Sequence, residues 1–127
     1  MDSFFLNDDR HLNNIAVIEE NNRFSYCPIF DNGAALLSDM QMLRMDIMPK
    51  VLISELKARP FNTSFTRQMK SAETLFGRQL RIPDFSRIQI IEMLKPMLEY
   101  YAERDRGIIA DRVTECIISR QKVFLSV

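Results

Sequence analysis

The sequence predicts a mainly α-helical domain with one small β-hairpin. Apolar residues recur at helical spacing in three segments after residue 63, and a β-branched run and an alternating run flank a polar turn between residues 15 and 27. Of the 127 residues, 46% are hydrophobic and 27% charged, as in ordinary globular domains. We find no repeat, low-complexity run or linker, so we expect one domain over residues 1–127.

The amino-terminal part is expected to hold the hairpin. Residues 3–6 are largely apolar and predict the last turn of an element that begins upstream, which suggests a truncated gene, a misplaced start or a cut chain. Residues 7–14 predict a polar loop. Residues 15–18 and 23–27 predict two strands joined by a turn at residues 19–22, and Pro28 ends the second strand because it has no N–H to donate. Gly33 in Asp31-Asn32-Gly33 is expected to adopt a positive φ angle.

A helical region over residues 47–125 follows. Pro49 suits the first position of a short helix over residues 49–57. Ser64 and Gly77 suit the two ends of the next helix, and Ser86 with Gln89 has the spacing of a capping box at the start of a third. Pro96 predicts a kink or break in that third helix. Its expected buried stripe is Ile90, Leu94, Met97, Leu98 and Tyr101.

The last helix is expected to bury one apolar face. That face carries Ile109, Val113, Cys116 and Ile117. The intervening charged residues Arg112, Glu115 and Arg120 are expected to lie largely toward solvent.

Charge and cysteine content argue against several classes of protein. Lys plus Arg equals Asp plus Glu at 17 each, so no net field favours nucleic acid or an anionic membrane. Cys27 and Cys116 are isolated, which is typical of reduced thiols in a cytoplasmic protein. No segment has the pattern of a signal peptide or the length of a membrane span. We therefore expect a cytoplasmic protein that contacts neither nucleic acid nor membrane directly.

Two polar segments carry the candidate chemistry. An Asp and an Asn five residues apart occur in the loop at residues 7–14, and Asp31 follows the hairpin in residues 28–33. Spacing alone allows either Asp8 with Asn13 or Asp9 with Asn14. Carboxylate and amide oxygens suit Mg²⁺, and phosphoryl transfer depends on positioned charge. The hairpin would return the chain, so that three oxygen-bearing side chains converge where a metal-bound triphosphate could rest.

The order Asp9-Arg10-His11-Leu12-Asn13-Asn14 resembles the Asp-x-His-x-x-Asn loop of HipA-like serine/threonine kinases. The Pro28-Ile29-Phe30-Asp31 segment resembles the Pro-x-aromatic-Asp segment of the same family. Phosphatidylinositol kinases share the first element but usually continue with Asp-Phe-Gly. The resemblance covers residues 8–33 and implies a kinase C-terminal lobe, with Asp9 as catalytic base and Asn14 and Asp31 as ligands of Mg²⁺ and ATP.

The resemblance also implies two structural features of an N-terminal lobe, and the residues before Asp9 contain neither. A phosphate-covering glycine loop and a strand lysine belong to the N-terminal lobe, and residues 1–8 contain neither glycine nor lysine. We therefore expect little or no kinase activity from these 127 residues alone. The family implies a bacterial toxin–antitoxin setting, with the N-lobe or an antitoxin as partner. The alternative is a non-catalytic helical module that binds a partner or self-associates to form a homo-oligomer.

Two further residues of the loop are open to interpretation. His11 is the only histidine, so it cannot join a His-based metal cluster, and we expect it to pack and hydrogen-bond within the loop. Arg10 either neutralises phosphate or forms an ion pair with Asp8.

Overall fold

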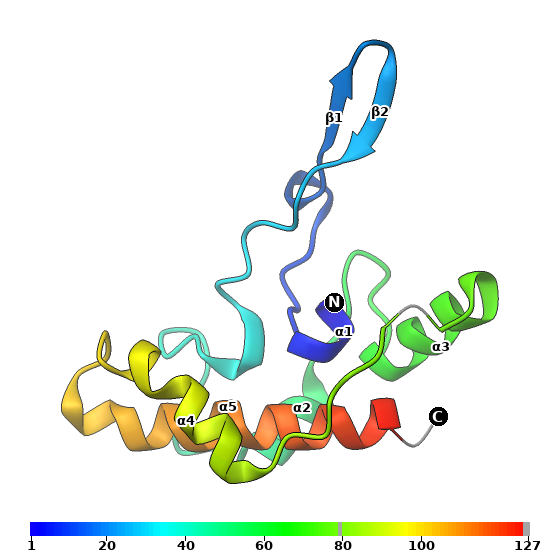
Figure 1. The fold of residues 1–127 in the computed structure, drawn as a ribbon. Coiled ribbons are helices and arrows are strands. Elements are labelled where there is room, and N and C mark those ends of the chain that lie inside the picture. Colours follow the sequence, from blue (N-terminus) through cyan, green and yellow to red (C-terminus); the bar gives the residue numbers. More distant parts are fainter. Residues whose placement is uncertain (79, 126–127) are drawn as a thin grey trace.

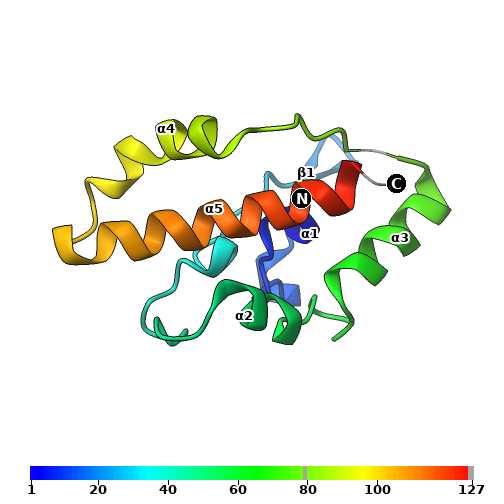
Figure 2. The same ribbon diagram turned by 90° about the horizontal axis from the view of Figure 1, so that it is seen from below.

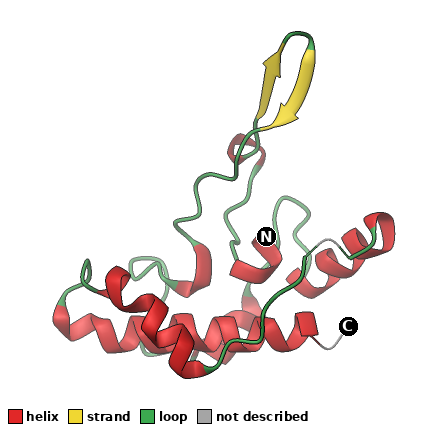
Figure 3. Ribbon diagram, in the orientation of Figure 1, coloured by secondary structure: helices red, strands yellow, loops and turns green. Residues whose placement is uncertain are grey.

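The computed structural model describes residues 1–78 and 80–125, and these residues form a helical body with a projecting hairpin (Figure 1). The helices are α1 (Asp2–Phe5), α2 (Pro49–Glu55), α3 (Phe65–Phe76), α4 (Arg87–Leu98) and α5 (Glu103–Leu125), with short 3-10 turns η1 (Leu12–Asn14) and η2 (Ala35–Leu37). The strands are β1 (Val17–Glu20) and β2 (Arg23–Tyr26). The prediction of a mainly helical chain with one hairpin is confirmed. Figure 3 shows that loops connect the hairpin to the helices.

Helix α5 is the centre of the helical body. It contacts α1, α2, α4 and η2, and the view from below shows it running between α4 and α2 (Figure 2). Ile109, Val113 and Cys116 on α5 are buried, as the helical pattern predicted. Ile90 of α4 is also fully buried. Within residues 1–78 and 80–125, no helix combines the length and the apolar character that crossing a bilayer requires.

Local signals set the ends of the helices. The Ser64 side chain accepts a hydrogen bond from the backbone N–H of Arg67, and α3 ends at Gly77 with φ of 72°. Ser86 and Gln89 form a reciprocal capping box at the start of α4. Helix α4 ends at Leu98, two residues beyond Pro96.

Two buried arginines contradict the sequence prediction for α5. Arg112 is 2% exposed and Arg120 is 4% exposed, although both were expected on the solvent side. Arg112 donates to the backbone carbonyls of Arg44 and Ile47, and Arg120 donates to the carbonyl of Ser3. Carbonyl oxygens from distant segments accept hydrogen bonds from both guanidinium groups, and burial lowers the pKa of both groups.

Helix α1 is anchored to the carboxyl-terminal end of α5. The ring of Phe4 meets the ring of Phe124 edge to face at 5.6 Å, and Met69 of α3 belongs to the same buried cluster. Leu6, directly after α1, is buried in a second cluster with Leu37, Leu52 and Cys116. The short helix is therefore held by packing on two sides.

The hairpin begins later in the sequence than predicted. Glu19 and Glu20 lie in β1, and the turn is reduced to Asn21 and Asn22. Both turn residues have positive φ angles, as a two-residue type I′ turn requires, and asparagine tolerates that conformation. The eight strand residues are all exposed.

Candidate functional site

The two candidate segments lie at the base of the hairpin, where it joins the helical body (Figure 1). The loop at residues 7–14 leads into β1, and residues 28–33 follow β2. Because the strands pair antiparallel from Val17 with Tyr26 to Glu20 with Arg23, the hairpin returns the chain to its starting point. The second segment is thereby brought beside the first.

Arg10 joins the two segments. Its Nη1 donates to the carbonyl oxygens of Asn14 at 3.0 Å and Phe30 at 2.7 Å. Its Nη2 donates to Oδ1 of Asn32 at 2.7 Å and Oδ1 of Asp2 at 3.0 Å, while Nε donates to the other Asp2 oxygen at 3.0 Å. These five bonds match the five N–H groups of a guanidinium. The ion pair is with Asp2, not with Asp8 as one reading of the sequence had it.

Asn7 makes a second connection between the segments. Its side-chain nitrogen donates to the Asp31 carbonyl at 3.4 Å and to Oδ1 of Asn32 at 3.3 Å, while its oxygen accepts from the Asp9 backbone N–H at 3.2 Å. Asn7 is almost completely buried. The side-chain amide of Asn7 therefore connects the main chain at Asp9 with the main chain at Asp31.

Asp9 and Asn14 are in direct contact. The Asn14 side-chain nitrogen donates to the Asp9 carbonyl at 3.1 Å, which leaves the amide oxygen of Asn14 as the atom that can face a cation. Asn14 is buried, whereas Asn13 is exposed. The 3-10 turn η1 places Asn14 at its last residue, three positions after the exposed His11.

Asp31 adopts the conformation that was expected of Gly33. Its φ angle is 55°, in the left-handed region, whereas Gly33 is not among the glycines with positive φ. Aspartate tolerates this region better than most residues, but the conformation still carries strain, which often marks functional sites. The Asp31 side chain is exposed. Within the described residues, no hydrogen bond reaches the carboxyl oxygens of Asp9 or Asp31.

Charge couples these groups through Arg10. The hydrogen bonding that Arg10 donates to the Asp2 carboxylate is the main cause that raises the pKa of Arg10, and the charges of Asp31 and Asp9 act in the same direction. Both predicted carboxylates therefore lie within electrostatic range of one buried guanidinium. Within the described residues, neither carboxylate forms an ion pair with this guanidinium.

The predicted side chains open onto different hollows. Asn14 and Arg10 line a pocket of about 330 Å³ with Pro28 and Phe30. Asp9 lines another, of about 280 Å³, with residues that include Asp8, Asp39 and Arg59. Asp31 lines neither. The structure thus brings the two segments together through their main chains, and it does not place the three side chains in one cavity.

The pocket at Asp9 has an acidic wall, formed by Asp8, Asp9 and Asp39. Burial raises the pKa of Asp8, and the nearby charges of Asp9 and Asp39 add to that shift, while Arg59 opposes it. No group of three or more His, Cys, Asp or Glu side chains in residues 1–78 and 80–125 is placed to hold a metal ion. The predicted ligand set has a different composition, since it includes an amide. Its hard oxygen atoms suit Mg²⁺, which keeps several waters and needs few protein ligands.

His11 differs from its predicted surroundings. Its backbone N–H donates to the Asp9 carbonyl at 2.9 Å, and its carbonyl accepts from Asn14 at 3.0 Å, so its main chain belongs to the loop network. Its side chain is exposed, which contradicts the expectation that it packs within the loop.

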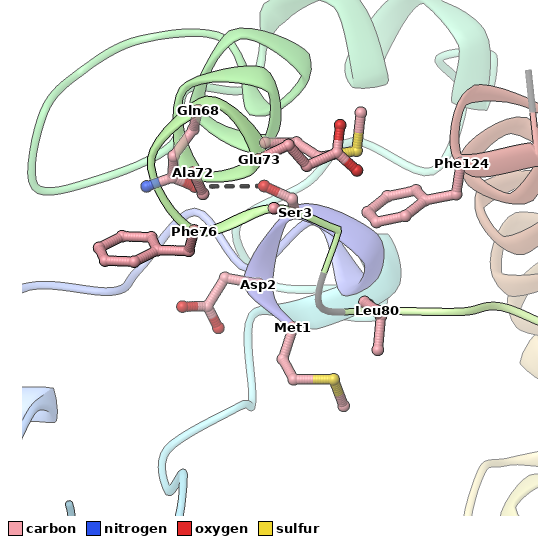
Figure 4. A pocket seen from close by; sticks show the side chains of 11 residues that line it. Met1, Asp2, Ser3, Gln68, Ala72, Glu73, Phe76, Leu80 and Phe124 are labelled. Carbon is pink, nitrogen blue, oxygen red and sulfur yellow. Dashed lines mark hydrogen bonds between the residues drawn. The ribbon is translucent and has the colours of Figure 1, made fainter. Parts of the chain in front are cut away.

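A further pocket of about 380 Å³ lies between α1, α3 and the end of α5 (Figure 4). Met69, Leu80 and Phe124 give it an apolar wall, and the Ser3 hydroxyl donates to the Gln68 side chain across it at 3.3 Å. None of the predicted site residues lines this pocket. Asp2 lines both this pocket and the one at Asn14.

Sequence reasoning missed the residues that hold the segments together. Asp2, Asn7 and Asn32 carried no periodic or motif signal, and the bonds that join them to Arg10 or to the other segment span 8 to 25 residues. Arg10 lay inside the motif, but its five bonds could not be deduced from its position. The sequence did not show that the polar side chains of Asn7 and Arg10 are buried, and this burial is what identifies them in the structure.

No protein-family model matches this chain, and searches of curated proteins and of solved structures return no match either.

Proposed function

We propose that this chain is the C-terminal lobe of a HipA-like serine/threonine kinase, built for Mg²⁺-dependent phosphoryl transfer from ATP to a protein hydroxyl. Asp9 would orient the hydroxyl and accept its proton. Asn14 and Asp31 would hold the Mg²⁺ ion that neutralises the phosphates. An N-terminal lobe would supply the phosphate-covering loop and the lysine, because positioning accounts for nearly all of this catalysis.

The observation that carries the proposal is the hydrogen-bonded junction between the two motif segments. Arg10 and Asn7 hold residues 7–14 against residues 28–33, while the Asp9 and Asp31 carboxyls stay exposed and unbonded within the described residues. Asp31 also keeps a left-handed backbone conformation that is costly for a residue other than glycine, and such conformations cluster at functional sites. In the family setting, the protein is cytoplasmic and bacterial, and an antitoxin is its partner.

Calorimetric titration with Mg²⁺ and ATP tests the metal site. We expect weak binding to the chain, and we expect Asp31→Asn to remove the heat because the carboxylate is a ligand. Asp111→Asn is the matched control, since Asp111 is an exposed aspartate on α5. Equal heats from the two variants would reject the assignment of Asp31.

A phosphotransfer assay tests Asp9. When the chain is joined to an N-lobe, Asp9→Asn should abolish phosphorylation of a protein hydroxyl, whereas Asp111→Asn should leave it unchanged. Unchanged transfer by Asp9→Asn would remove Asp9 from the base role.

The hairpin favours a second candidate function, a non-catalytic module that self-associates. The pairing register puts Val17, Phe24 and Tyr26 on one face, and Tyr26 is 85% exposed. A two-stranded hairpin is marginally stable alone in water, so a covering surface would stabilise it. Sedimentation at rising concentration tests this function: it predicts association that Phe24→Ser weakens, and a monomer at all concentrations would contradict it.

A further inference from the structure

We propose that the free edge of β2 pairs antiparallel with the same edge of a second copy of this chain, and that Ser25 lies opposite Ser25 in the resulting four-stranded sheet. The proposal rests on the second candidate function above, self-association. It adds which edge of the hairpin pairs and in which register.

The hairpin is a small sheet without cover. The residues that the structure describes form one sheet of two strands, and all eight strand residues are exposed. The hairpin projects away from the helical body, which leaves both of its edges open (Figure 1). A two-stranded hairpin alone is marginal in water, whereas three or more strands with an apolar face can be stable. Added strands would therefore stabilise it.

Pairing within the hairpin determines which backbone groups point outward. The N–H of Cys27 donates to the carbonyl of Ala16 at 3.0 Å, and hydrogen-bonded and non-hydrogen-bonded pairs alternate along antiparallel strands. In the observed register, the backbone groups of Ser25 therefore face β1, and those of Phe24 and Tyr26 face away from it. The outer edge of β2 thus offers two N–H and two C=O groups for pairing.

One antiparallel register uses all of these groups. With Ser25 opposite Ser25 of the second copy, Phe24 of each copy lies opposite Tyr26 of the other, and the two pairs exchange four hydrogen bonds. A shift of two residues one way would place the turn residue Asn22 opposite Tyr26. A shift the other way would place Pro28, which has no N–H, opposite Phe24. The favoured register is two-fold symmetric and gives a closed dimer.

Charge favours the edge of β2 over the edge of β1. Strand β1 ends in Glu19 and Glu20, so pairing two β1 edges would gather two carboxylates from each copy, and like charges on an edge oppose pairing. Strand β2 has no carboxylate, and its one charged residue, Arg23, lies opposite Glu20 in the same hairpin. In the proposed register, Arg23 lies opposite Cys27 of the second copy, so the two arginines are not neighbours.

The aromatic side chains of β2 favour the same arrangement. Residues directly opposite each other share one face of a sheet, so Phe24 of one copy would lie beside Tyr26 of the other, and aromatic pairs of this kind stabilise sheets. Phe24 is 71% exposed, and Val17 extends the same apolar face. Because an edge of four residues makes a small interface, we expect a weak dimer.

Amide hydrogen exchange of the whole chain, measured by NMR at low and high protein concentration with both cysteines reduced, tests the choice of edge. The amides of Phe24 and Tyr26 should exchange more slowly as concentration rises, because pairing buries them. The outward amides of Val17 and Glu19 on β1 are the internal control, and their exchange should not change. Equal slowing at both edges, or slowing of the β1 amides alone, would overturn the proposal.

A charge swap at Ser25 tests the register. Ser25→Lys and Ser25→Glu each place like charges directly opposite each other, so each should raise the dimer Kd in sedimentation equilibrium about fivefold. An equimolar mixture of the two variants should restore association. Ser71→Lys and Ser71→Glu are the matched controls, since Ser71 is an exposed serine on α3, and they should leave the Kd unchanged. Wild-type association of both Ser25 variants would overturn the register.

The outcomes separate self-association from the pairing mode. A monomer at every concentration would make self-association wrong, and the pairing would fall with it. A dimer in which Phe24 and Tyr26 exchange as fast as in the monomer would leave self-association standing and reject the pairing. Growth beyond a dimer would indicate β1-to-β2 pairing and contradict the two-fold arrangement. Should the Ser25 variants fail to fold, hydrogen exchange in the wild type decides.

Discussion

The left-handed conformation of Asp31 predicts an unusual order of stabilities among its variants. Asp31→Ala and Asp31→Gly both remove the carboxylate, but only alanine keeps a Cβ atom at φ of 55°. A Cβ atom in this region costs about 1–2 kcal/mol, and the larger unfolded-state entropy of glycine offsets about 0.4–1 kcal/mol of that difference. We expect Asp31→Gly to be more stable than Asp31→Ala by about 0.5–1 kcal/mol.

Urea unfolding followed by circular dichroism measures this difference. With a slope of about 2 kcal/mol per molar, the midpoints should differ by about 0.3–0.5 M, at equal slopes. The same two substitutions at Asp111 provide the control, because this residue lies inside α5 and glycine costs about 1 kcal/mol relative to alanine in a helix. The order of stabilities should therefore reverse. If Asp31→Ala is as stable as Asp31→Gly, residue 31 is not held in the left-handed region.

Three further predictions concern the helical body. Burial raises the pKa of the Cys116 thiol to about 12, above its pKa in the unfolded chain. The neutral thiol therefore contributes its full stability below the unfolded pKa, and this stability is lost as the pH rises toward 12. Denaturant titrations at rising pH should show this loss of stability. Alkylation followed by mass spectrometry should modify the half-buried Cys27 before Cys116, and equal alkylation rates would contradict the burial of Cys116. Ser86→Ala removes the capping box and should cost about 1 kcal/mol in thermal unfolding, whereas an unchanged midpoint would show that the cap is not formed. Ile90→Ala should lower the free energy of unfolding by about 2–5 kcal/mol in chemical denaturation. The control Ile88→Ala should lower it by less than about 0.5 kcal/mol, because the Ile88 side chain is 74% exposed. Similar losses in the two variants would contradict the packing of α4.

The helices and the hairpin were predictable because local residues mark their ends. Ser64, Gly77 and Ser86 act on their own helix termini, so short stretches of sequence contain the necessary information. The hairpin was predicted, but its turn was drawn two residues too long on the β1 side. Glutamate is a poor strand former in isolation, and only the pairing of Glu20 with Arg23 across the strands places it in the sheet.

Burial of charge was not predictable from helical periodicity. Arg112 and Arg120 were placed outside because a charged residue on an amphipathic helix usually faces water. Their acceptors are main-chain carbonyls 65 and 117 residues away in sequence, so nothing near them signals burial. The same limit applies to the candidate site. The motif picked out the exposed carboxylates, whereas the buried side chains that join its two segments depend on the folded hairpin.

Paramagnetic broadening by Mn²⁺ tests most directly whether the two motif segments share one ion. In ¹H–¹⁵N spectra of wild type, substoichiometric Mn²⁺ should broaden the amides of Asp9, Asn14 and Asp31 together, while Asn21 at the tip of the hairpin stays sharp. Asp31→Asn should restore all three signals. Broadening confined to one segment, or spread equally over Asn21, would contradict a metal site formed where the chain returns to its own loop.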